Sequence, residues 1–384
     1  MAKIQLLNKI SQVGLKQFND KYEIGDAIAD PDAILVRSAA MHDMEFGASL
    51  KAIGRAGAGV NNIPVDRCAE NGIVVFNTPG ANANGVKELA VAALMLASRD
   101  IVGGIQWANS LTTDVAKSVE KGKSAFAGNE IMGKTLGVIG LGAIGGLVAN
   151  VAKSLGMEVI GCDPYITIDG AWHLSRSIQK AASYDEIFEK ADYISLHVPA
   201  TPQTKNMICA DSIAKMKQGV RIINLARADL VNAADIKAAI EAGKVASYVT
   251  DFPTEETIGV KGIVTIPHLG ASTEESEDNC AVMAANELMD YLENGNIKNS
   301  VNFPNLNLPH TAAHRIVILH KNIPNMIAHI TGSLADQNIN IENLVNASKG
   351  DFAGTIAETN SPIDDAVVTK IAAIDGIIRV IKIS

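Results

Sequence analysis

One glycine-rich motif constrains the fold of this chain more than any other feature. Gly140-Leu141-Gly142-Ala143-Ile144-Gly145 directly follows the apolar segment 136–139 and directly precedes a helical pattern. In such a GxGxxG turn, Gly140 permits the tight turn, Gly142 lets the backbone approach a pyrophosphate, and Gly145 lets helix and strand pack closely. The N–H groups at the start of the next helix then receive the phosphate charge. The motif predicts a dinucleotide site.

The next predicted strand indicates which nucleotide binds. It ends in Asp163, eighteen residues after Gly145 (163 − 145 = 18), which is the spacing of an acid that binds a ribose. A carboxylate there hydrogen-bonds both ribose hydroxyls and repels a 2′-phosphate, so NAD is favoured over NADP. The alternative is that Asp163 caps a turn before Pro164. The strand–glycine–helix–strand–Asp context favours the ribose interpretation.

Short apolar segments predict an α/β fold. They have the character of strands buried on both faces, and they fall into two series separated by a long helical stretch that begins near Glu88. The segments are residues 4–7, 34–36, 50–53 and 73–76 in the first series, and 136–139, 158–160, 193–196, 221–224, 246–249 and 263–266 in the second. Six strands with helical patterns between them match a doubly wound sheet.

The C-terminal part predicts a separate small unit. A long helix is expected from Thr273 to about Glu293, and the segment 299–309, with four Asn and two Pro, breaks all periodicity and is the predicted linker. Beyond it the order is βαββαβ, which is the ferredoxin-like motif. Its expected strands are residues 316–319, 344–346, 355–357 and 377–383, and its expected helices are 326–336 and 364–373.

Composition excludes several classes of function. Lys and Arg number 33 against 42 Asp and Glu, and the net charge of −9 argues against nucleic-acid or membrane partners. The longest apolar run, residues 89–97, is far shorter than the roughly 20 residues of a membrane span. The first residues lack an apolar signal core, so we expect a cytoplasmic protein. The four cysteines lie far apart without a CxxC pair, so neither a disulfide framework nor a metal site is expected.

Polar residues follow three successive strands of the second series. Arg227 lies where a guanidinium could clamp a carboxylate bidentately. Glu255 and His268 follow the next two strands, and a His beside a carboxylate can serve as an oriented acid or base. Each residue alone is more often a surface or loop residue. Because all three stand at strand ends of a sheet that already holds a dinucleotide motif, together they predict an acid–base site.

At a set of motifs the chain resembles a known family, the NAD-dependent D-2-hydroxyacid dehydrogenases. The resemblance covers nearly the whole chain, and within the family it is to the members that act on 3-phospho-D-glycerate. The matching motifs are residues 55–63 (RAGAGVNNI), 77–79 (NTP), 140–145 (GLGAIG), 224–227 (NLAR) and 268–273 (HLGAST).

The resemblance implies an architecture of three parts. It implies two doubly wound, Rossmann-like lobes, namely a discontinuous substrate-binding lobe of residues 1–96 and 282–306 around an NAD-binding lobe of residues 97–281. Residues 310–384 would form an ACT domain, a small-molecule sensor appended to many enzymes of amino-acid biosynthesis. A homodimer or homotetramer is expected.

The resemblance also implies a reaction, the oxidation of 3-phospho-D-glycerate to 3-phosphooxypyruvate that begins the phosphorylated route to L-serine. Arg227, Glu255 and His268 would be the catalytic trio. His268 would take the C2 hydroxyl proton as hydride leaves for NAD, Glu255 would stabilise the imidazolium, and Arg227 would bind the carboxylate. Glu256 stands where the family has Pro, so Glu255 or Glu256 could be the partner, and the Phe-x-x-Glu spacing favours Glu255.

Other site residues follow from the same resemblance. NAD would be bound by Gly140, Gly142, Ala143, Ile144, Gly145, Asp163, Leu225, Ala226, Arg227, Asp251, His268, Gly270 and Ala271. Thr250 and Asp251 stand where the family has Asp and then Val, so either could contact the nicotinamide. The substrate carboxylate would meet the backbone of Ala58 and Gly59 together with Arg227. Arg37 and Arg55 are the candidates for its phosphate; otherwise they anchor loops or the surface.

The expected effector is L-serine, the end product of the route. Position by position, His320, Asn322 and Asn340 match the serine contacts of regulated members, and Asn side chains offer donors and acceptors for an amino acid. The alternative is a degenerate domain kept for contacts between subunits.

Two other functions compete with this interpretation. One is a dehydrogenase for an unphosphorylated acid such as glyoxylate or hydroxypyruvate, which would need neither Arg37 nor Arg55 and would not usually carry the C-terminal unit. The other is a non-catalytic NAD-sensing protein. Assays of NADH oxidation with a panel of 2-oxoacids would separate the three.

Overall fold

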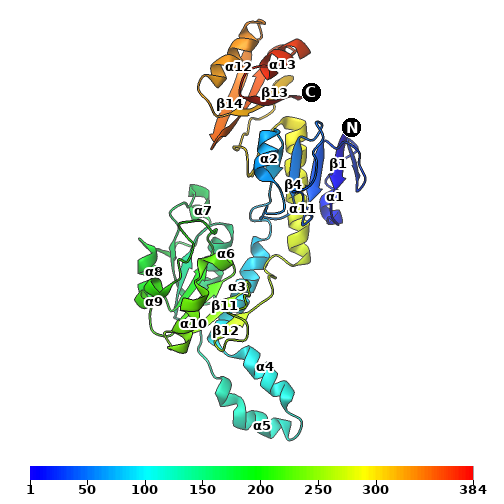
Figure 1. Ribbon diagram of the computed structural model, residues 1–384. Coiled ribbons are helices and arrows are strands. Elements are labelled where there is room, and N and C mark those ends of the chain that lie inside the picture. The colour runs from blue at the N-terminus through cyan, green and yellow to red at the C-terminus, as the bar shows by residue number, and fades with distance from the viewer. Residues whose placement is uncertain (384) are drawn as a thin grey trace. The chain divides into compact units, whose positions relative to one another are not determined.

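A computed structural model describes residues 1–383, and it divides into two compact units (Figure 1). Unit 1 contains residues 1–82 and the chain from residue 277 onward, and unit 2 is the continuous segment Ala83–Ser276. The division into substrate, NAD and ACT parts at the residues expected from the sequence stays a prediction.

The first sheet of unit 1 is parallel and has the strand order β2-β1-β3-β4-β5. Its strands are β1 (Ala2–Leu6), β2 (Tyr22–Gly25), β3 (Ala33–Val36), β4 (Ala52–Arg55) and β5 (Val74–Phe76). Helices α1 (Gln12–Leu15), α2 (Val65–Glu70) and α11 (Glu274–Asn294) accompany it. The four predicted strands are confirmed, since β3 and β5 are buried throughout. The edge strand β2 was not predicted, because only Tyr22 in it is buried.

The sheet of unit 2 has the order β12-β11-β10-β9-β6-β7-β8, and all of its pairs are parallel. Its strands are β6 (Thr135–Ile139), β7 (Glu158–Cys162), β8 (Gln179–Lys180), β9 (Tyr193–Leu196), β10 (Val220–Asn224), β11 (Val245–Thr250) and β12 (Ile263–Thr265). The strand order reverses between β6 and β9, so the sheet is doubly wound and its switch point lies at the glycine motif. All six predicted strands are confirmed.

The helical stretch predicted after Glu88 is broken into separate helices. They are α3 (Ala83–Ser98), α4 (Ile101–Ser110), α5 (Val115–Gly122) and the 3₁₀ turn η1 (Lys123–Phe126). Asp100 ends the run, because its carboxylate accepts the Gly103 N–H (2.9 Å) and caps a new helix. The other helices of unit 2 are α6 (Ala143–Ser154), α7 (Ile168–Trp172), α8 (Tyr184–Lys190), α9 (Ala210–Lys215), η2 (Ala228–Leu230) and α10 (Ala233–Glu241).

The C-terminal domain within unit 1 has the predicted βαββαβ order. Its elements are β13 (His314–Lys321), α12 (Met326–Ala335), β14 (Ile341–Lys349), β15 (Phe352–Thr359), α13 (Asp365–Ala372) and β16 (Ile377–Ile383). The sheet order β14-β15-β13-β16 is antiparallel throughout, which is the ferredoxin-like arrangement. Both helices pack on one face of this sheet through apolar side chains such as Ile316, Ile330 and Ile371.

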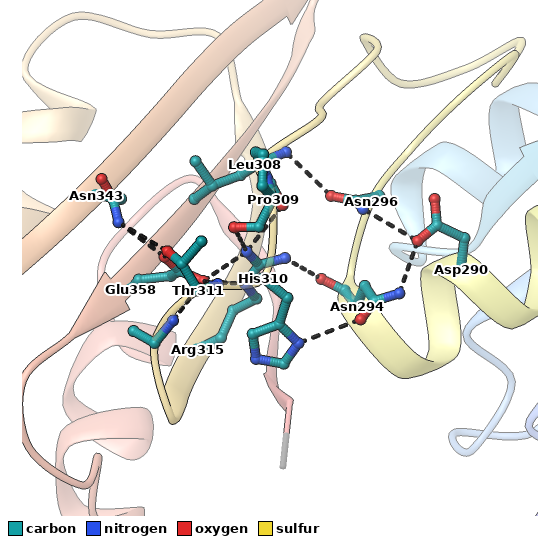
Figure 2. A network of polar contacts seen from close by, with 11 residues as sticks. Asp290, Asn294, Asn296, Leu308, Pro309, His310, Thr311, Arg315, Asn343 and Glu358 are labelled. Atoms are coloured by element: carbon teal, nitrogen blue, oxygen red, sulfur yellow. Dashed lines mark hydrogen bonds and ion pairs between the residues drawn. The ribbon is translucent and has the colours of Figure 1, made fainter.

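A buried ion pair lies inside the C-terminal domain, and its arginine also links the domain to the end of α11 (Figure 2). Arg315 on β13 and Glu358 on β15 pair at 2.6 Å, and both side chains are completely buried. Arg315 also donates to the carbonyl oxygens of Asn294 (2.7 Å), Leu308 and Pro309 (2.8 Å each). Burial alone would raise the pKa of Glu358, but the hydrogen bonds it accepts, first from Arg315, outweigh burial and lower it to about 2.

None of the helices in residues 1–383 has the length and apolar character needed to cross a membrane. No cluster of three His, Cys, Asp or Glu side chains in this part of the chain could hold a metal ion. All four cysteines are free thiols, and Cys68, Cys162 and Cys280 are buried.

Candidate active site

The glycine motif forms the loop between β6 and α6, and the local geometry explains why glycine occupies each of its three positions. Gly140 has a φ of +89°, and its N–H donates to the Cys162 carbonyl (2.9 Å). A Cβ on Gly145 would lie 1.9 Å from the Gly140 carbonyl oxygen, so no side chain fits there. A Cβ on Gly142 would meet nothing within 4 Å. The N-terminus of α6 is therefore open to a pyrophosphate, and the residues present fit NAD.

Asp163 follows β7 and lies beside this loop. One carboxylate oxygen accepts the Leu141 N–H and the other accepts the Tyr165 N–H, both at 2.8 Å. Asp163 therefore caps the turn before Pro164 and also faces the glycine loop, so the two interpretations of this residue do not exclude each other. Carboxylate oxygens have further lone pairs with which they can accept from ribose hydroxyls.

Arg227 stands on a short loop after β10 that a buried side chain holds in place. The Asn224 amide donates to the Arg227 carbonyl (2.9 Å), and its oxygen accepts the Ala226 N–H (3.2 Å). Asn224 is fully buried, and sequence reasoning assigned it no role. The Arg227 side chain is exposed, and its guanidinium donates to the Ala226 carbonyl at 2.6 Å. Its remaining N–H groups can bind a carboxylate.

His268 follows β12 and has an exposed side chain. Its ring packs against Phe252, with 4.6 Å between the ring centroids and 50° between the planes. Among the hydrogen bonds recorded for residues 1–383, none involves either ring nitrogen of His268, whereas its backbone carbonyl accepts from Ser272. Both nitrogens are free to exchange a proton with a bound molecule.

The structure does not bring the expected carboxylate to His268. Glu255 and Glu256 are both exposed, and within the described residues neither forms a hydrogen bond or ion pair with the ring. Asp251, by contrast, is 1% exposed, and its Oδ1 has no hydrogen-bond partner in the described chain. Burial raises the pKa of Asp251, while the charges of His268 and Arg227 oppose that rise.

Thr250 and Asp251 differ in what their side chains already do. The Thr250 hydroxyl oxygen accepts the Phe252 N–H (3.1 Å), whereas Oδ1 of Asp251 is unpaired. A Cβ on Gly270 would lie 3.6 Å from the other oxygen of Asp251. Asp251 and Gly270 are therefore neighbours, and both belong to the predicted NAD set.

In unit 1 the two predicted phosphate ligands lie together at the carboxyl ends of β3 and β4. Arg55 donates from Nε to the Arg37 carbonyl (3.1 Å). Its guanidinium lies over Gly57, where a Cβ would be only 1.8 Å from Nη1. The Arg37 guanidinium pairs with Glu277 at 2.6 Å. Both are partly exposed, next to the loop that contains Ala58 and Gly59.

The predicted effector residues do not come together within one chain. His320 is 2% exposed, and its ring nitrogens already contact the Lys321 carbonyl (2.8 Å) and the Thr355 hydroxyl (3.1 Å). Asn322 follows the end of β13, and its side chain donates to the Gly350 carbonyl. Asn340 precedes β14, whose first residue pairs beside the opposite end of β13. At about 3.3 Å per residue, this places the two asparagines roughly 25 Å apart.

Comparison with known proteins agrees with this geometry. The family model described as "D-isomer specific 2-hydroxyacid dehydrogenase, NAD binding domain" matches residues 91–271. A D-3-phosphoglycerate dehydrogenase of Synechocystis is 37% identical over 315 residues, which cover 79% of this chain and 54% of that protein. This chain thus spans about half the length of that relative.

A second relative and a solved structure extend the similarity. The relative is a "Putative D-3-phosphoglycerate dehydrogenase" of Schizosaccharomyces pombe. It is 30% identical over 401 residues, which cover 93% of this chain and 82% of that protein. An NAD⁺-bound 3-phosphoglycerate dehydrogenase of Entamoeba histolytica matches with a TM-score of 0.61 and 28% identity, covering 78% of this chain and 98% of that one. By these similarities and by its NAD-binding domain, the chain belongs to the family of D-isomer specific 2-hydroxyacid dehydrogenases.

Proposed function

We propose that the protein is a cytoplasmic NAD-dependent dehydrogenase that oxidises the C2 hydroxyl of 3-phospho-D-glycerate to 3-phosphooxypyruvate, the first step of the phosphorylated route to L-serine. The observation that carries the choice of substrate is the pair Arg37 and Arg55, which lie side by side at two strand ends. Two guanidinium groups suit a phosphate. The names of the Synechocystis and Entamoeba relatives support the same substrate.

The residues of unit 2 account for the chemistry. His268, with both ring nitrogens free of protein partners, takes the hydroxyl proton. Arg227 binds the substrate carboxylate and polarises the developing carbonyl, and Glu255, with Glu256 as the alternative, stabilises the imidazolium. A bound NAD would supply the hydride acceptor for this oxidation. The unpaired Oδ1 of Asp251 supports this residue, rather than Thr250, as the group that would accept a hydrogen bond from the nicotinamide amide.

Steady-state kinetics test the proposal. We expect a higher kcat/KM for 3-phosphooxypyruvate than for hydroxypyruvate or glyoxylate with NADH. Arg37→Ala and Arg55→Ala should lower kcat/KM for the phosphorylated substrate by about 10- to 100-fold, the loss typical of one charged hydrogen bond, and should change hydroxypyruvate reduction much less. Arg176→Ala, an exposed arginine of unit 2, is the control. Equal losses on both substrates would make the arginines structural and favour an unphosphorylated acid.

We further propose that L-serine is an effector held between two copies of the chain. The separation of Asn322 from Asn340 within one chain supports this, because a second copy could supply the missing side of the site. Titration of L-serine against initial velocity, for the wild type and for Asn340→Ala, tests it. Absence of inhibition at millimolar serine, in an enzyme active on 3-phosphooxypyruvate, would leave a domain that serves contacts alone.

A second copy is also proposed to cover α4 and α5, giving a homodimer or homotetramer. Neither helix contains a buried residue, and Ile101, Val102 and Ile105 of α4 are exposed. Exposed apolar residues grouped on one helix mark contact surfaces. We expect sedimentation to show an oligomer that Ile105→Asp weakens, whereas a monomeric wild type would contradict the proposal.

A further inference from the structure

A cavity in unit 1, with both polar and apolar lining residues, has no part in the proposed reaction. It has a volume of about 640 Å³ and lies along one face of α11. Asn279, Asn286 and Asp290 line it from the helix at intervals of seven and four residues, which places them on one face. Gly80 and Ala81 line it as well, together with the segment that follows α11. The phosphate ligands Arg37 and Arg55 are not among its lining residues.

A buried and half-satisfied carboxyl group belongs to this cavity. Glu287 lines it but is only 6% exposed, and its Oε1 accepts the Asn299 amide at 2.7 Å. Its Oε2 has no hydrogen-bond partner in the described chain. Burial raises the pKa of Glu287 to about 7. Leaving a buried polar atom unpaired is costly, so a donor from outside the chain is expected at this place. The terminal torsion of a Glu side chain is soft, so the carboxyl can turn toward such a donor.

The other charged residues that line the cavity indicate which chemical groups the bound molecule has. Asp290 uses one carboxylate oxygen to accept from the amides of Asn294 and Asn296 (2.9 and 3.0 Å; Figure 2), and its other oxygen has no recorded partner in the described chain. Lys298 is exposed at the rim and forms no ion pair with a described residue. Two carboxyl groups and one ammonium group in the lining of one cavity complement a molecule that has both an amine and a carboxylate.

We propose that this cavity binds an α-amino acid with an apolar side chain. Its ammonium group meets the carboxylates of Glu287 and Asp290, its carboxylate meets Lys298, and its side chain packs on Val282 and Met283, which also line the cavity. This binding site is separate from the proposed substrate residues and from the residues proposed for serine. The inference does not depend on the dehydrogenase activity.

Isothermal titration of the full chain with L-leucine and its two half-molecules tests the proposal. The probe 3-methylbutylamine keeps the amine and lacks the carboxylate, and 4-methylpentanoate keeps the carboxylate and lacks the amine. We expect saturable binding of L-leucine. Each half-molecule should bind at least about 10- to 100-fold more weakly, because 3-methylbutylamine loses the charged contact with Lys298 and 4-methylpentanoate loses those with Glu287 and Asp290. The removal of either charge from the protein, by Glu287→Gln or Lys298→Ala, should weaken L-leucine binding by a similar factor.

Glu293→Gln is the matched control, because Glu293 lies on the same helix but outside the cavity, where it pairs with Lys21. It should leave the affinity for L-leucine unchanged. Should Glu287→Gln fail to fold, as judged by circular dichroism, the exposed Lys298→Ala still decides the question. The proposal is overturned by absence of saturable L-leucine binding to the wild type, which would leave water as the only occupant, or by equal weakening in the Glu293 control. Since no catalysis is measured, its failure is distinguishable from failure of the proposed reaction.

Discussion

Two clusters of charged residues in this molecule contain similar side chains in opposite surroundings. In the C-terminal domain, Arg315 and Glu358 are completely buried, and several hydrogen bonds from the chain satisfy them. In unit 2, Arg227 and His268 are exposed after strands of a parallel sheet, and neither forms an ion pair with an acidic residue among residues 1–383. The protein itself uses the hydrogen-bonding capacity of the first cluster, whereas the second cluster has donors and acceptors that a bound molecule could use. Under the proposed function, the degree of satisfaction, rather than residue type, distinguishes the structural charges from the proposed catalytic ones.

The two surroundings also determine what a mutation costs. Removal of one member of a buried ion pair leaves the other charge without compensation in a medium of low polarity. An exposed side chain is solvated by water in both the folded and the unfolded state, so its removal changes the free energy of unfolding little. Activity and stability should therefore respond to different residues.

His268→Ala should lower turnover with 3-phosphooxypyruvate by about 10²- to 10⁴-fold, the usual contribution of a general acid–base. The melting temperature should stay near that of the wild type, because the side chain is exposed and its ring nitrogens form no recorded bond in the described chain. Stopped-flow measurement of NADH oxidation and a thermal melt give the two numbers. A variant that retains more than a third of wild-type turnover, with chemistry rate-limiting, would remove His268 from the mechanism.

Arg315→Met should lower the free energy of unfolding of the C-terminal domain by about 3–5 kcal/mol, because Glu358 is left buried and unpaired. The double variant Arg315→Met/Glu358→Leu should recover most of that loss, since it buries no charge. Urea denaturation followed by circular dichroism measures both. A loss of under about 1 kcal/mol in the single variant would show that water reaches the pair, and the contrast between the clusters would fail.

Glu287 is an intermediate case, since it is buried but only half satisfied, and it should reveal itself in the dependence of stability on pH. Because its folded pKa of about 7 lies above its ordinary value, the folded state holds the proton more tightly. The stabilising contribution of the protonated Glu287 to the free energy of unfolding is fully present below about pH 4.5 and is lost as the pH rises through 7. Glu287→Gln should therefore stabilise the protein at pH 8, by up to about 3 kcal/mol, and have little effect at pH 4.5. Thermal melts at both values, with Glu293→Gln as control, would show whether the gain is specific.

Asp163 should have the smallest effect, because it is partly exposed and already accepts two backbone N–H groups. Asp163→Ser, with an arginine added nearby, should raise the use of NADP relative to NAD by removing the repulsion of a 2′-phosphate. The ratio of kcat/KM for the two cofactors measures it. Equal efficiency of the wild type with both would show that this carboxylate does not select the cofactor.

Local features of the fold were predictable from the sequence, and distant pairings were not. The glycine motif and its flanking strands are dictated by neighbours in the chain, so the roles of Gly140 and Gly145 followed from spacing. Arg315 and Glu358 are 43 residues apart, and each alone resembles a surface charge on a strand. The sequence interval between Glu255 and His268 likewise does not determine the path of the loop that joins them. In the structure, the charge of His268 acts on the pKa of Asp251 instead.

The discontinuity of unit 1 has a consequence for synthesis on the ribosome. Residues 1–82 form a sheet that has one of its two apolar faces covered by α11, since Ala284 and Leu288 belong to the same buried cluster as strand residues such as Leu35 and Phe76. Between them the ribosome makes the 194 residues of unit 2 (276 − 83 + 1), which at 5–20 residues per second takes roughly 10–40 s. Unit 2 is continuous and can fold as it emerges, whereas one apolar face of the first sheet stays exposed until α11 has been synthesised. The nascent chain is therefore most open to aggregation and to chaperones in its first 82 residues, although these are synthesised first.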